Sequence, residues 1–243
     1  MESDKEWRYW GETDPLYAVY SRSDKKKGLP GAWSDDDFRR SGEAYFADVA
    51  RQWRQYGMGR LRCIEVGCGA GRITGQLLHH FEAVTALDVS ERQIETAARL
   101  LGPLASRVSF HVVDRPVIPA PDGGCDGFFS CEVFQHFSDP TVVGRYLLAA
   151  YPKLSAGGTI CFQLPVKGMQ RLASPLFRLR ARSTGIQRAL GRRLIMEYRY
   201  YSAPDVFADM KTAGFTDCEM RIFETHEHDG RHVYFFGRKG RGS

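Results

Sequence analysis

The chain alternates short apolar runs with stretches of helical periodicity, and this alternation constrains the fold more than any other feature of the sequence. Between the runs, apolar residues recur every three or four positions. Near-continuous apolar strands that alternate with helices are typical of a parallel sheet with helices on both faces. We therefore predict an α/β fold with a doubly wound sheet. Its strands are LRCIEV (61–66), AVTALDV (83–89), RVSFHVVD (107–114), CDGFFSC (125–131) and GGTICFQLP (157–165).

The end of the chain departs from this alternation. Two further apolar runs, RIFET (221–225) and HVYFFGRK (232–239), are separated by six residues, which leaves no room for a helix between them. Strands joined so closely are expected to pair as an antiparallel hairpin. We predict that this hairpin, preceded by a helix at 201–215, completes the sheet over residues 200–243.

The length of 243 residues is enough to bury one substantial core, and we predict a single domain over residues 1–243. Two segments lie outside the alternation. Residues 1–58 are rich in Trp and Tyr, and residues 166–199 hold nine Lys or Arg and one Glu. Because ligands of open α/β sheets bind at the carboxyl ends of the strands, we expect 1–58 to form an N-terminal cap over that edge and 166–199 a basic cap insertion.

The first apolar run leads directly into a glycine-rich turn, Gly67-Cys68-Gly69-Ala70-Gly71. Glycines allow the backbone to pass close to a ligand, and the start of the following helix offers unpaired N–H groups. Dinucleotide-binding enzymes use a similar turn with the pattern GxGxxG, in which the last glycine permits close packing of helix and strand. Arg72 stands in place of that glycine, which disfavours a dinucleotide.

Acidic residues stand at three successive strand ends: Glu65 before the turn, Asp88 after the second run and Asp114 after the third. Together with VGCGAG, they resemble the successive motifs of class I S-adenosylmethionine-dependent methyltransferases. The stretch 119–140 is similar to the fourth-strand region of the ubiquinone- and menaquinone-type branch of that family. The resemblance identifies residues 60–165 as the cofactor-binding core. It implies a Rossmann-like sheet, mostly parallel, with a C-terminal antiparallel hairpin strand.

The resemblance also implies roles at the cofactor, S-adenosylmethionine. Gly67 and Gly69 would approach its methionine and ribose portions. Asp88 would accept hydrogen bonds from both ribose hydroxyls, which an ionised carboxylate can do, and Asp114 would meet the adenine amino group. The alternatives are a helix N-cap for Asp88 and a turn former before Pro116 for Asp114. The candidate cofactor residues are Glu65, Gly67, Cys68, Gly69, Gly71, Asp88, Val89, Asp114, Arg115 and Cys131.

The proton of an acceptor hydroxyl needs a base, and His136 is our candidate. It follows the fourth strand, five residues after Cys131, where the family places residues between cofactor and substrate. A structural histidine in the loop before Asp139 is the alternative. Glu132 and Gln135 are further candidates for hydrogen bonds to substrate or cofactor.

A second histidine cluster lies in the predicted hairpin turn. His226, His228 and His232 flank Glu227 and Asp229, and a metal-assisted transfer would need such ligands. Their alternating spacing, with no long-range partner, favours a polar hairpin turn. We therefore predict no metal site.

These features predict an enzyme, an O-methyltransferase of a small-molecule acceptor such as a secondary metabolite, sugar or lipid precursor. An RNA methyltransferase would place the basic residues of 166–199 against phosphates. No RNA-binding module and no Asn-Pro-Pro-Tyr-like motif accompanies them, which disfavours a nucleic acid partner. The third alternative is a methyltransferase-like scaffold that binds a partner through the leucines of the same segment, and a merely solvated basic face is also consistent with it.

The six cysteines are scattered without a CxxC pair, and the N-terminus lacks the apolar core of a signal peptide, which favours the cytoplasm. All apolar stretches are far shorter than the about 20 residues that cross a bilayer, so we expect no transmembrane helix. The sequence leaves open a peripheral membrane contact, a homodimer, the acceptor and its regiochemistry, O- against N- or C-methylation, and metal dependence.

Overall fold

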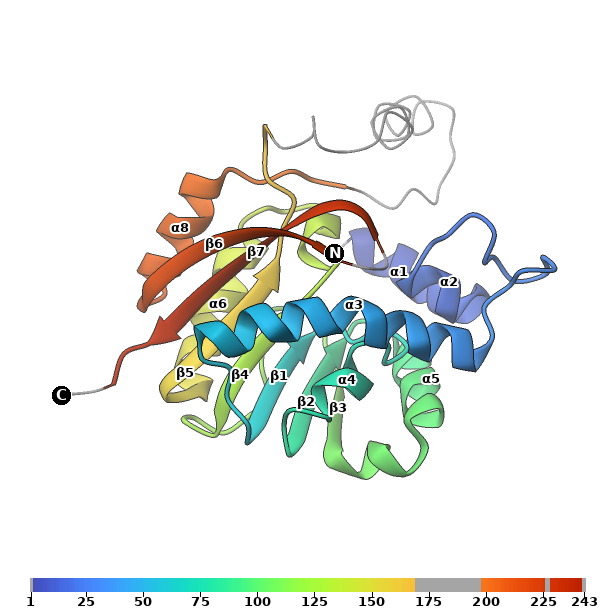
Figure 1. Ribbon diagram of the computed structural model, residues 1–243, viewed down its shortest axis with the longest axis horizontal. Helices are drawn as coiled ribbons and strands as arrows, with labels where there is room; N and C mark the ends of the chain where they lie inside the picture. The colour runs from blue at the N-terminus through green and yellow to red at the C-terminus, as the bar shows by residue number, and fades with distance from the viewer. Residues whose placement is uncertain (1, 169–197, 226–227, 242–243) are drawn as a thin grey trace.

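The computed structural model of the chain describes residues 2–168, 198–225 and 228–241. Its centre is a seven-stranded sheet with the order β3-β2-β1-β4-β5-β7-β6 (Figure 1). Neighbouring strands from β3 to β5 are parallel, and β7 is antiparallel to both β5 and β6. The predicted Rossmann-like α/β fold with a C-terminal antiparallel hairpin is confirmed. The strands are β1 (Arg62–Val66), β2 (Ala83–Asp88), β3 (Val108–Val112), β4 (Cys125–Ser130), β5 (Leu154–Gln163), β6 (Phe215–Thr225) and β7 (His228–Lys239).

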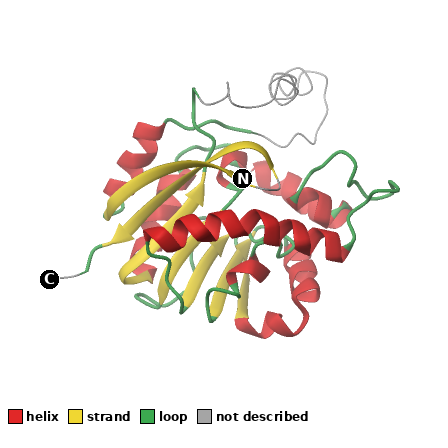
Figure 2. Cartoon of the chain, in the orientation of Figure 1, coloured by secondary structure: helices red, strands yellow, loops and turns green. Residues whose placement is uncertain are grey.

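Helices cover both faces of the sheet (Figure 2). On one face lie α3 (Asp35–Tyr56), α4 (Thr74–Leu77) and α5 (Glu91–Leu101), and on the other α6 (Val142–Lys153) and α8 (Ala203–Thr212). The remaining elements are α1 (Glu2–Thr13), α2 (Pro15–Val19) and the 3-10 helices η1 (Gly102–Arg107) and η2 (Phe134–His136).

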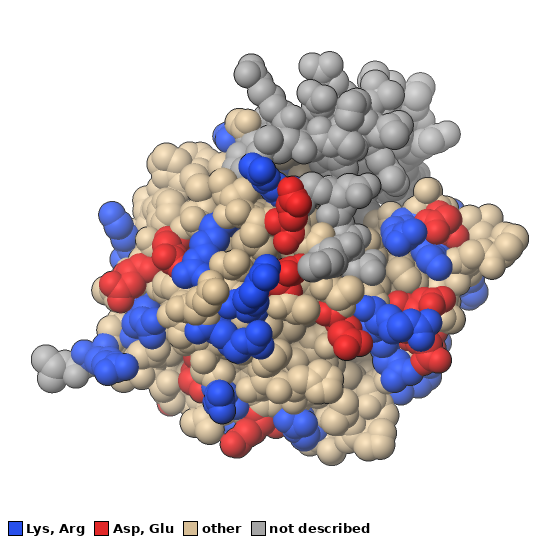
Figure 3. All heavy atoms as spheres, viewed as in Figure 1, with Lys and Arg blue, Asp and Glu red and all other residues tan. Residues whose placement is uncertain are grey.

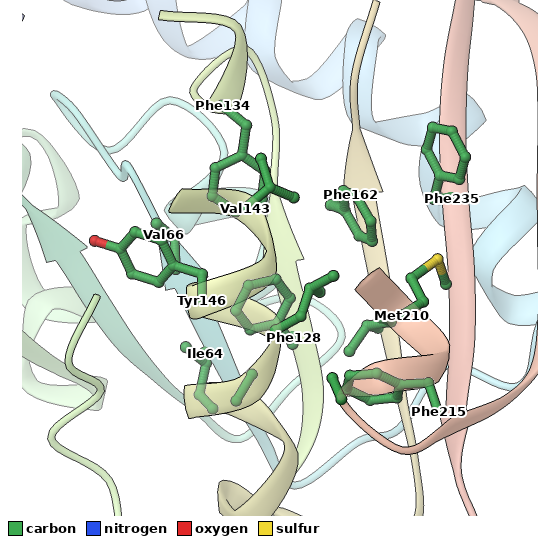
Figure 4. Close-up of a cluster of buried hydrophobic side chains, with 14 of the residues drawn as sticks. Ile64, Val66, Phe128, Phe134, Val143, Tyr146, Phe162, Met210, Phe215 and Phe235 are labelled. Carbon is green, nitrogen blue, oxygen red and sulfur yellow. The ribbon is translucent and has the colours of Figure 1, made fainter. Parts of the chain in front are cut away.

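The larger core lies between the sheet and the α6/α8 face. Figure 4 shows Ile64 and Phe128 from the central strands pointing toward Tyr146 of α6, with Met210 of α8 beside Phe235. Each of these side chains is at most 4% exposed, so the face excludes water along its length. Burial of apolar side chains on this scale is the main force that stabilises the sheet. It thereby holds the ends of the strands in fixed positions.

The second core lies under α3, which runs across the opposite face of the sheet (Figure 1). Trp53 is fully buried there, its ring stacked on Phe129 with centroids 5.8 Å apart, and its Nε1 donates to Thr159 Oγ1 at 2.9 Å. We expected residues 1–58 to lie as a cap over the carboxyl edge. For α3 that expectation is wrong, because its aromatic side chains fill the space between the helix and the strands.

Several predicted boundaries differ from the structure: the helix predicted at 201–215 spans Ala203–Thr212, and the strand predicted at 157–165 spans Leu154–Gln163. The helix after the glycine turn has only four residues, although Leu77, Leu78 and Phe81 are buried as their periodicity indicates. No side chain caps its start, and so little supports a longer helix. Strands β6 and β7 are both longer than predicted, since β6 is an edge strand with many exposed polar side chains that hide its period.

The charged surface that the structure describes is mixed in sign. On the face seen in Figure 3, Lys and Arg side chains are interspersed with Asp and Glu side chains. Along α3, Arg40 pairs with Asp37 and Arg51 with Asp48. Most of the basic segment 166–199 lies outside the described residues. Among the helices that the structure describes, none is long and apolar enough to span a membrane.

Candidate functional site

The glycine turn lies at the carboxyl end of β1 and is tied to the end of β2. The backbone N–H groups of Gly67 and Cys68 both donate to the Leu87 carbonyl oxygen, at 2.7 and 3.0 Å. Gly67, Gly69 and Gly71 have φ of +77°, +50° and +81°, a region that side chains disfavour. The three glycines therefore let the chain reverse within five residues while Cys68 is buried beneath it.

The same glycines are required by close packing. A Cβ on Gly67 would lie 2.2 Å from Val133 Cγ2, and one on Gly69 would lie 2.5 Å from Val19 Cγ2. Val133 follows β4 and Val19 ends α2, so the turn is enclosed by the fourth strand on one side and by the N-terminal helices on the other. The backbone of the turn is thus held at the centre of the sheet's carboxyl edge.

Asp88 is the last residue of β2, and its carboxylate faces the turn. Oδ2 accepts from the Gly69 N–H at 2.8 Å, and Oδ1 accepts from the Ser90 N–H at 2.9 Å. Burial raises the pKa of Asp88, while the backbone donors oppose that rise. Ser90, not Asp88, is the N-cap of α5, so the alternative role of Asp88 as a cap is wrong. Each carboxylate oxygen keeps acceptor capacity for a ligand hydroxyl.

Glu65 is buried within β1, 3% exposed, and its Oε2 accepts from Thr74 Oγ1 at 2.6 Å. Burial raises the pKa of this carboxyl to about 7, and the hydrogen bond from Thr74 opposes the rise. The contact joins β1 to the start of α4 across the glycine turn. Glu65 therefore shapes the turn from beneath.

The remaining candidate cofactor residues follow the ends of β2 and β3. The N–H of Val113 donates to the Asp88 carbonyl oxygen at 2.8 Å, which holds the segment after β3 beside β2. Asp114 and Arg115 come next and are exposed, and Val89 is half-buried. A carboxylate at position 114 is thus free to meet a polar group of a ligand at this edge.

Cys131 directly follows β4 and lies in a buried hydrogen-bonded group with two tyrosines. Its Sγ is 3.0 Å from Tyr45 Oη and 3.4 Å from Tyr234 Oη, and the two hydroxyls also contact each other. Burial raises the pKa of the Cys131 thiol to about 12. The thiol therefore stays protonated at neutral pH and does not act as a nucleophile. Its hydrogen bonds link α3, β4 and β7.

His136 ends η2, the short helix after β4. Its ring is 4.8 Å from the Trp7 ring and 6.2 Å from the Tyr198 ring, measured between centroids. Trp7 belongs to α1, which also packs on α5, where a Cβ on Gly11 would lie 2.3 Å from Ser90 Oγ. Helix α1 thus connects the start of α5 to the segment that carries His136.

Three charged or titratable residues lie together at this edge: Arg72, which was not predicted as a site residue, Glu132, which was a further candidate for hydrogen bonds to substrate or cofactor, and His232, which was weighed only as a metal ligand. Glu132 Oε1 lies 3.7 Å from His232 Nδ1, and Glu132 has a φ of +57°. The Gln135 amide donates to the other Glu132 oxygen at 2.7 Å. A non-glycine residue in this conformation is strained, and such strain is common at functional sites.

Arg72 is 4% exposed, and its guanidinium lies between two aromatic rings, 4.6 Å from the Tyr20 centroid and 5.0 Å from the Tyr45 centroid. Burial, with the charge of Arg72 as a smaller cause, lowers the pKa of His232 to about 4. Burial raises the pKa of Glu132, and Arg72 opposes that rise. At neutral pH the imidazole of His232 is therefore uncharged.

Sequence spacing gives little signal for this group, because the three residues are 60 and 100 positions apart. Only their places after the glycine turn, after β4 and in β7 could have indicated them. Within the described parts of the chain, no three His, Cys, Asp or Glu side chains are grouped to hold a metal ion. His226 and Glu227 of the second histidine cluster lie outside the described residues.

The part of the sequence that forms this edge is similar to known methyltransferases. Residues 63–158 match the family described as a methyltransferase domain. An O-methyltransferase of Penicillium expansum, cnsE, is 34% identical over 79 residues, which are 31% of this chain and 29% of that protein. A ubiquinone biosynthesis O-methyltransferase of Caulobacter sp. (strain K31) is 29% identical over 99 residues, 40% of this chain and 38% of that protein. The matched stretch thus spans well under half of either relative.

Solved structures show the same fold over nearly the whole chain. The N-methyltransferase NodS from Bradyrhizobium japonicum WM9, in complex with S-adenosyl-L-homocysteine, aligns with a TM-score of 0.59 at 15% identity, over 98% of this chain and 99% of that one. The [4+2]-cyclase SpnF aligns with a TM-score of 0.60 at 18% identity, over 99% and 97%. One architecture therefore carries different reactions. The part of the chain that matches a methyltransferase domain, residues 63–158, holds the glycine turn and Asp88.

Proposed function

We propose that the protein is an S-adenosylmethionine-dependent methyltransferase that transfers a methyl group to a hydroxyl of a small molecule. The observation that carries this proposal is the Asp88 carboxylate, which faces the Gly69 backbone within a methyltransferase domain. Both partial relatives named above are O-methyltransferases, which supports oxygen as the methylated atom.

The residues at the carboxyl edge fit such a cofactor. The positive φ angles of the turn glycines hold their backbone beside the Asp88 carboxylate, and we propose that the cofactor lies along this part of the carboxyl edge. Asp88 has acceptor capacity for two ribose hydroxyls, and the exposed Asp114 is available to an adenine amino group. We propose that the remaining members of the predicted set, Val89, Arg115 and Cys131, line the same crevice.

When bound, S-adenosylmethionine supplies a methyl group on a positively charged sulfur, which is already a good electrophile. The protein's own tasks are then to orient the acceptor and to exclude water. Helices α1 and α2 suit the second task, since Val19 lies over Gly69 and Trp7 contacts His136. His136 stays our sequence-based candidate for the residue that takes the acceptor's proton.

Isothermal titration calorimetry with S-adenosylhomocysteine tests the proposal. Two hydrogen bonds to an ionised group contribute about 1.5–3 kcal/mol each, so Asp88→Asn should weaken binding by at least about 100-fold. Asn keeps one acceptor for the turn, and circular dichroism would check that the variant folds. Asp122→Asn is the matched control, because Asp122 pairs with Lys153 before β4 begins. Unchanged affinity in Asp88→Asn would contradict the assignment.

Location and partners follow from the same proposal. The scattered cysteines support a cytoplasmic protein, and a small-molecule acceptor is its main partner, with a homodimer as a further prediction. The RNA alternative depends on basic residues of which most lie outside the described part of the chain. The scaffold alternative predicts no heat on titration with S-adenosylhomocysteine, so the same experiment separates it from an enzyme.

A further inference from the structure

Glu132 follows β4 and His232 lies in β7, and these two strands flank β5 in the sheet. In the sheet, Gln163 at the end of β5 is paired with Tyr234 of β7, so His232 lies just beyond the carboxyl end of β5. The Glu132 N–H donates to Gln163 Oε1 at 3.2 Å, which brings the residue after β4 to the same place. The two side chains thus reach one another from strands on either side of β5.

The surroundings define one orientation for the imidazole. Nδ1 faces Glu132 Oε1 at 3.7 Å, and the edge of the ring packs against Tyr45 at 5.9 Å between centroids. The side chain of His232 is 14% exposed, and that of Glu132 is 27% exposed. The charged or titratable groups around them are Arg72, Tyr45, Cys131, Tyr198 and Tyr234.

We propose that His232, in place of the sequence-based candidate His136, takes the proton of the acceptor hydroxyl, and that Glu132 is the positioning residue that holds its imidazole with the proton on Nδ1. This inference rests on the proposed function. A carboxylate beside one ring nitrogen favours the tautomer with the proton on that nitrogen, which leaves Nε2 to accept another. The 3.7 Å separation suits a ligand-free site, in which such contacts are often long.

The proposed step balances in atoms and charge. The hydroxyl proton passes to His232 Nε2 as an oxygen electron pair forms the bond to the methyl carbon. The electron pair of the broken carbon–sulfur bond stays on sulfur, which becomes a neutral thioether. The resulting imidazolium is stabilised by the Glu132 carboxylate and later releases the proton to water.

Three features of the pair suit this step. The imidazole is uncharged at neutral pH and so can accept a proton, whereas a charged one could not. Glu132 is held in a strained backbone conformation, and its second oxygen is fixed by Gln135. Burial raises the pKa of the Glu132 carboxyl, and the nearby Arg72 and the hydrogen bond from Gln135 both oppose that rise.

Nitrogen NMR of histidine-labelled, cofactor-free protein tests the inference without any need for activity. The chemical shifts of the two ring nitrogens report which one carries the proton. We expect His232 to carry it on Nδ1 in the wild type, and Glu132→Ala to shift the population to Nε2–H, while Glu132→Asp retains part of the preference. His80, a half-buried histidine on Phe46, is the control and should not change. A wild-type His232 with its proton on Nε2 would overturn the inference.

Methylation of two probes, catechol and thiophenol, adds a kinetic readout. We expect His232→Gln to lower kcat for catechol by about 100-fold or more, with KM nearly unchanged, because general base catalysis contributes on that scale. Thiophenol is ionised at about pH 8 and needs no base, so its kcat should fall far less. His80→Gln is again the control. Equal losses for both probes would contradict a role in proton transfer. If the wild type methylates neither probe, the NMR result alone decides.

A failure of this inference is distinguishable from a failure of the proposed function. Cofactor binding is measured by calorimetry on Asp88 variants, whereas the tautomer of His232 is measured without cofactor. Normal S-adenosylhomocysteine binding with the wrong tautomer would reject only the role of His232. Absent binding with the expected tautomer would reject the proposed function.

Discussion

The glycine turn with Asp88 and the pair of Glu132 with His232 lie at the same edge of the sheet, but they are assembled in different ways. The first is built within about one βαβ unit, from Glu65 to Asp88, and most of its contacts are hydrogen bonds that backbone N–H groups donate to the Asp88 carboxylate and the Leu87 carbonyl oxygen. The second combines residues 100 positions apart and depends on how β7 pairs with β5. A site formed by elements that are neighbours along the chain can therefore be predicted from the sequence. A site formed by the pairing of distant strands cannot.

The largest expected effect comes from a side chain in the locally built turn. Gly67→Ala would combine a φ of +77° with a contact of 2.2 Å to Val133, and should destabilise the fold by about 2–5 kcal/mol. Denaturant unfolding measures the loss. Gly123→Ala separates the two causes, because Gly123 has a φ of +66° and open space around it. A loss at Gly67 no larger than that at Gly123 would show that packing against β4 does not restrict the turn.

The two parts of the site also differ in how far the sequence predicts them. The strands, the turn and Asp88 were predictable because apolar runs and glycines act over a few residues. The N-terminal segment was partly misassigned, since the aromatic side chains of α3 are equally consistent with a cap and with a sheet-covering helix. The pair at 132 and 232 could not be predicted, because nothing in the local sequence reports which residues of β7 lie opposite the end of β5.

The next effect concerns the buried carboxyl under the turn. Because burial raises the pKa of Glu65 from its ordinary 4.5 to about 7, the folded protein binds this proton more tightly than the unfolded chain does. The free energy of unfolding should therefore fall as pH rises from 4.5 to 7, by up to about 3 kcal/mol from this group.

Glu65→Gln removes that titration. The stability of the variant relative to the wild type should increase across the same pH window, measured by urea unfolding at several pH values. Asp114→Asn is the control, because Asp114 is exposed. A difference between Glu65→Gln and wild type that is independent of pH would indicate that the Glu65 carboxyl is not desolvated, and that the turn is looser than described.

The smallest expected effect on stability comes from Glu132, which belongs to the pair formed by distant strands. Glu132→Gly relieves the strain of a φ of +57° and should leave stability unchanged or raise it by about 1 kcal/mol, although it removes a carboxylate. Asp217→Gly at a φ of +51° in the edge strand β6 is the matched control. Both variants should unfold alike, but only Glu132→Gly should alter the tautomer of His232. A clear loss of stability on Glu132→Gly alone would mark Glu132 as a structural residue.

A crystal structure with S-adenosylhomocysteine tests the central claim most directly. The account predicts the nucleoside against the backbone of Gly67 and Gly69, with both ribose hydroxyls within hydrogen-bonding distance of the Asp88 carboxylate. A ligand bound elsewhere, or a ribose that makes no contact with Asp88, would contradict it.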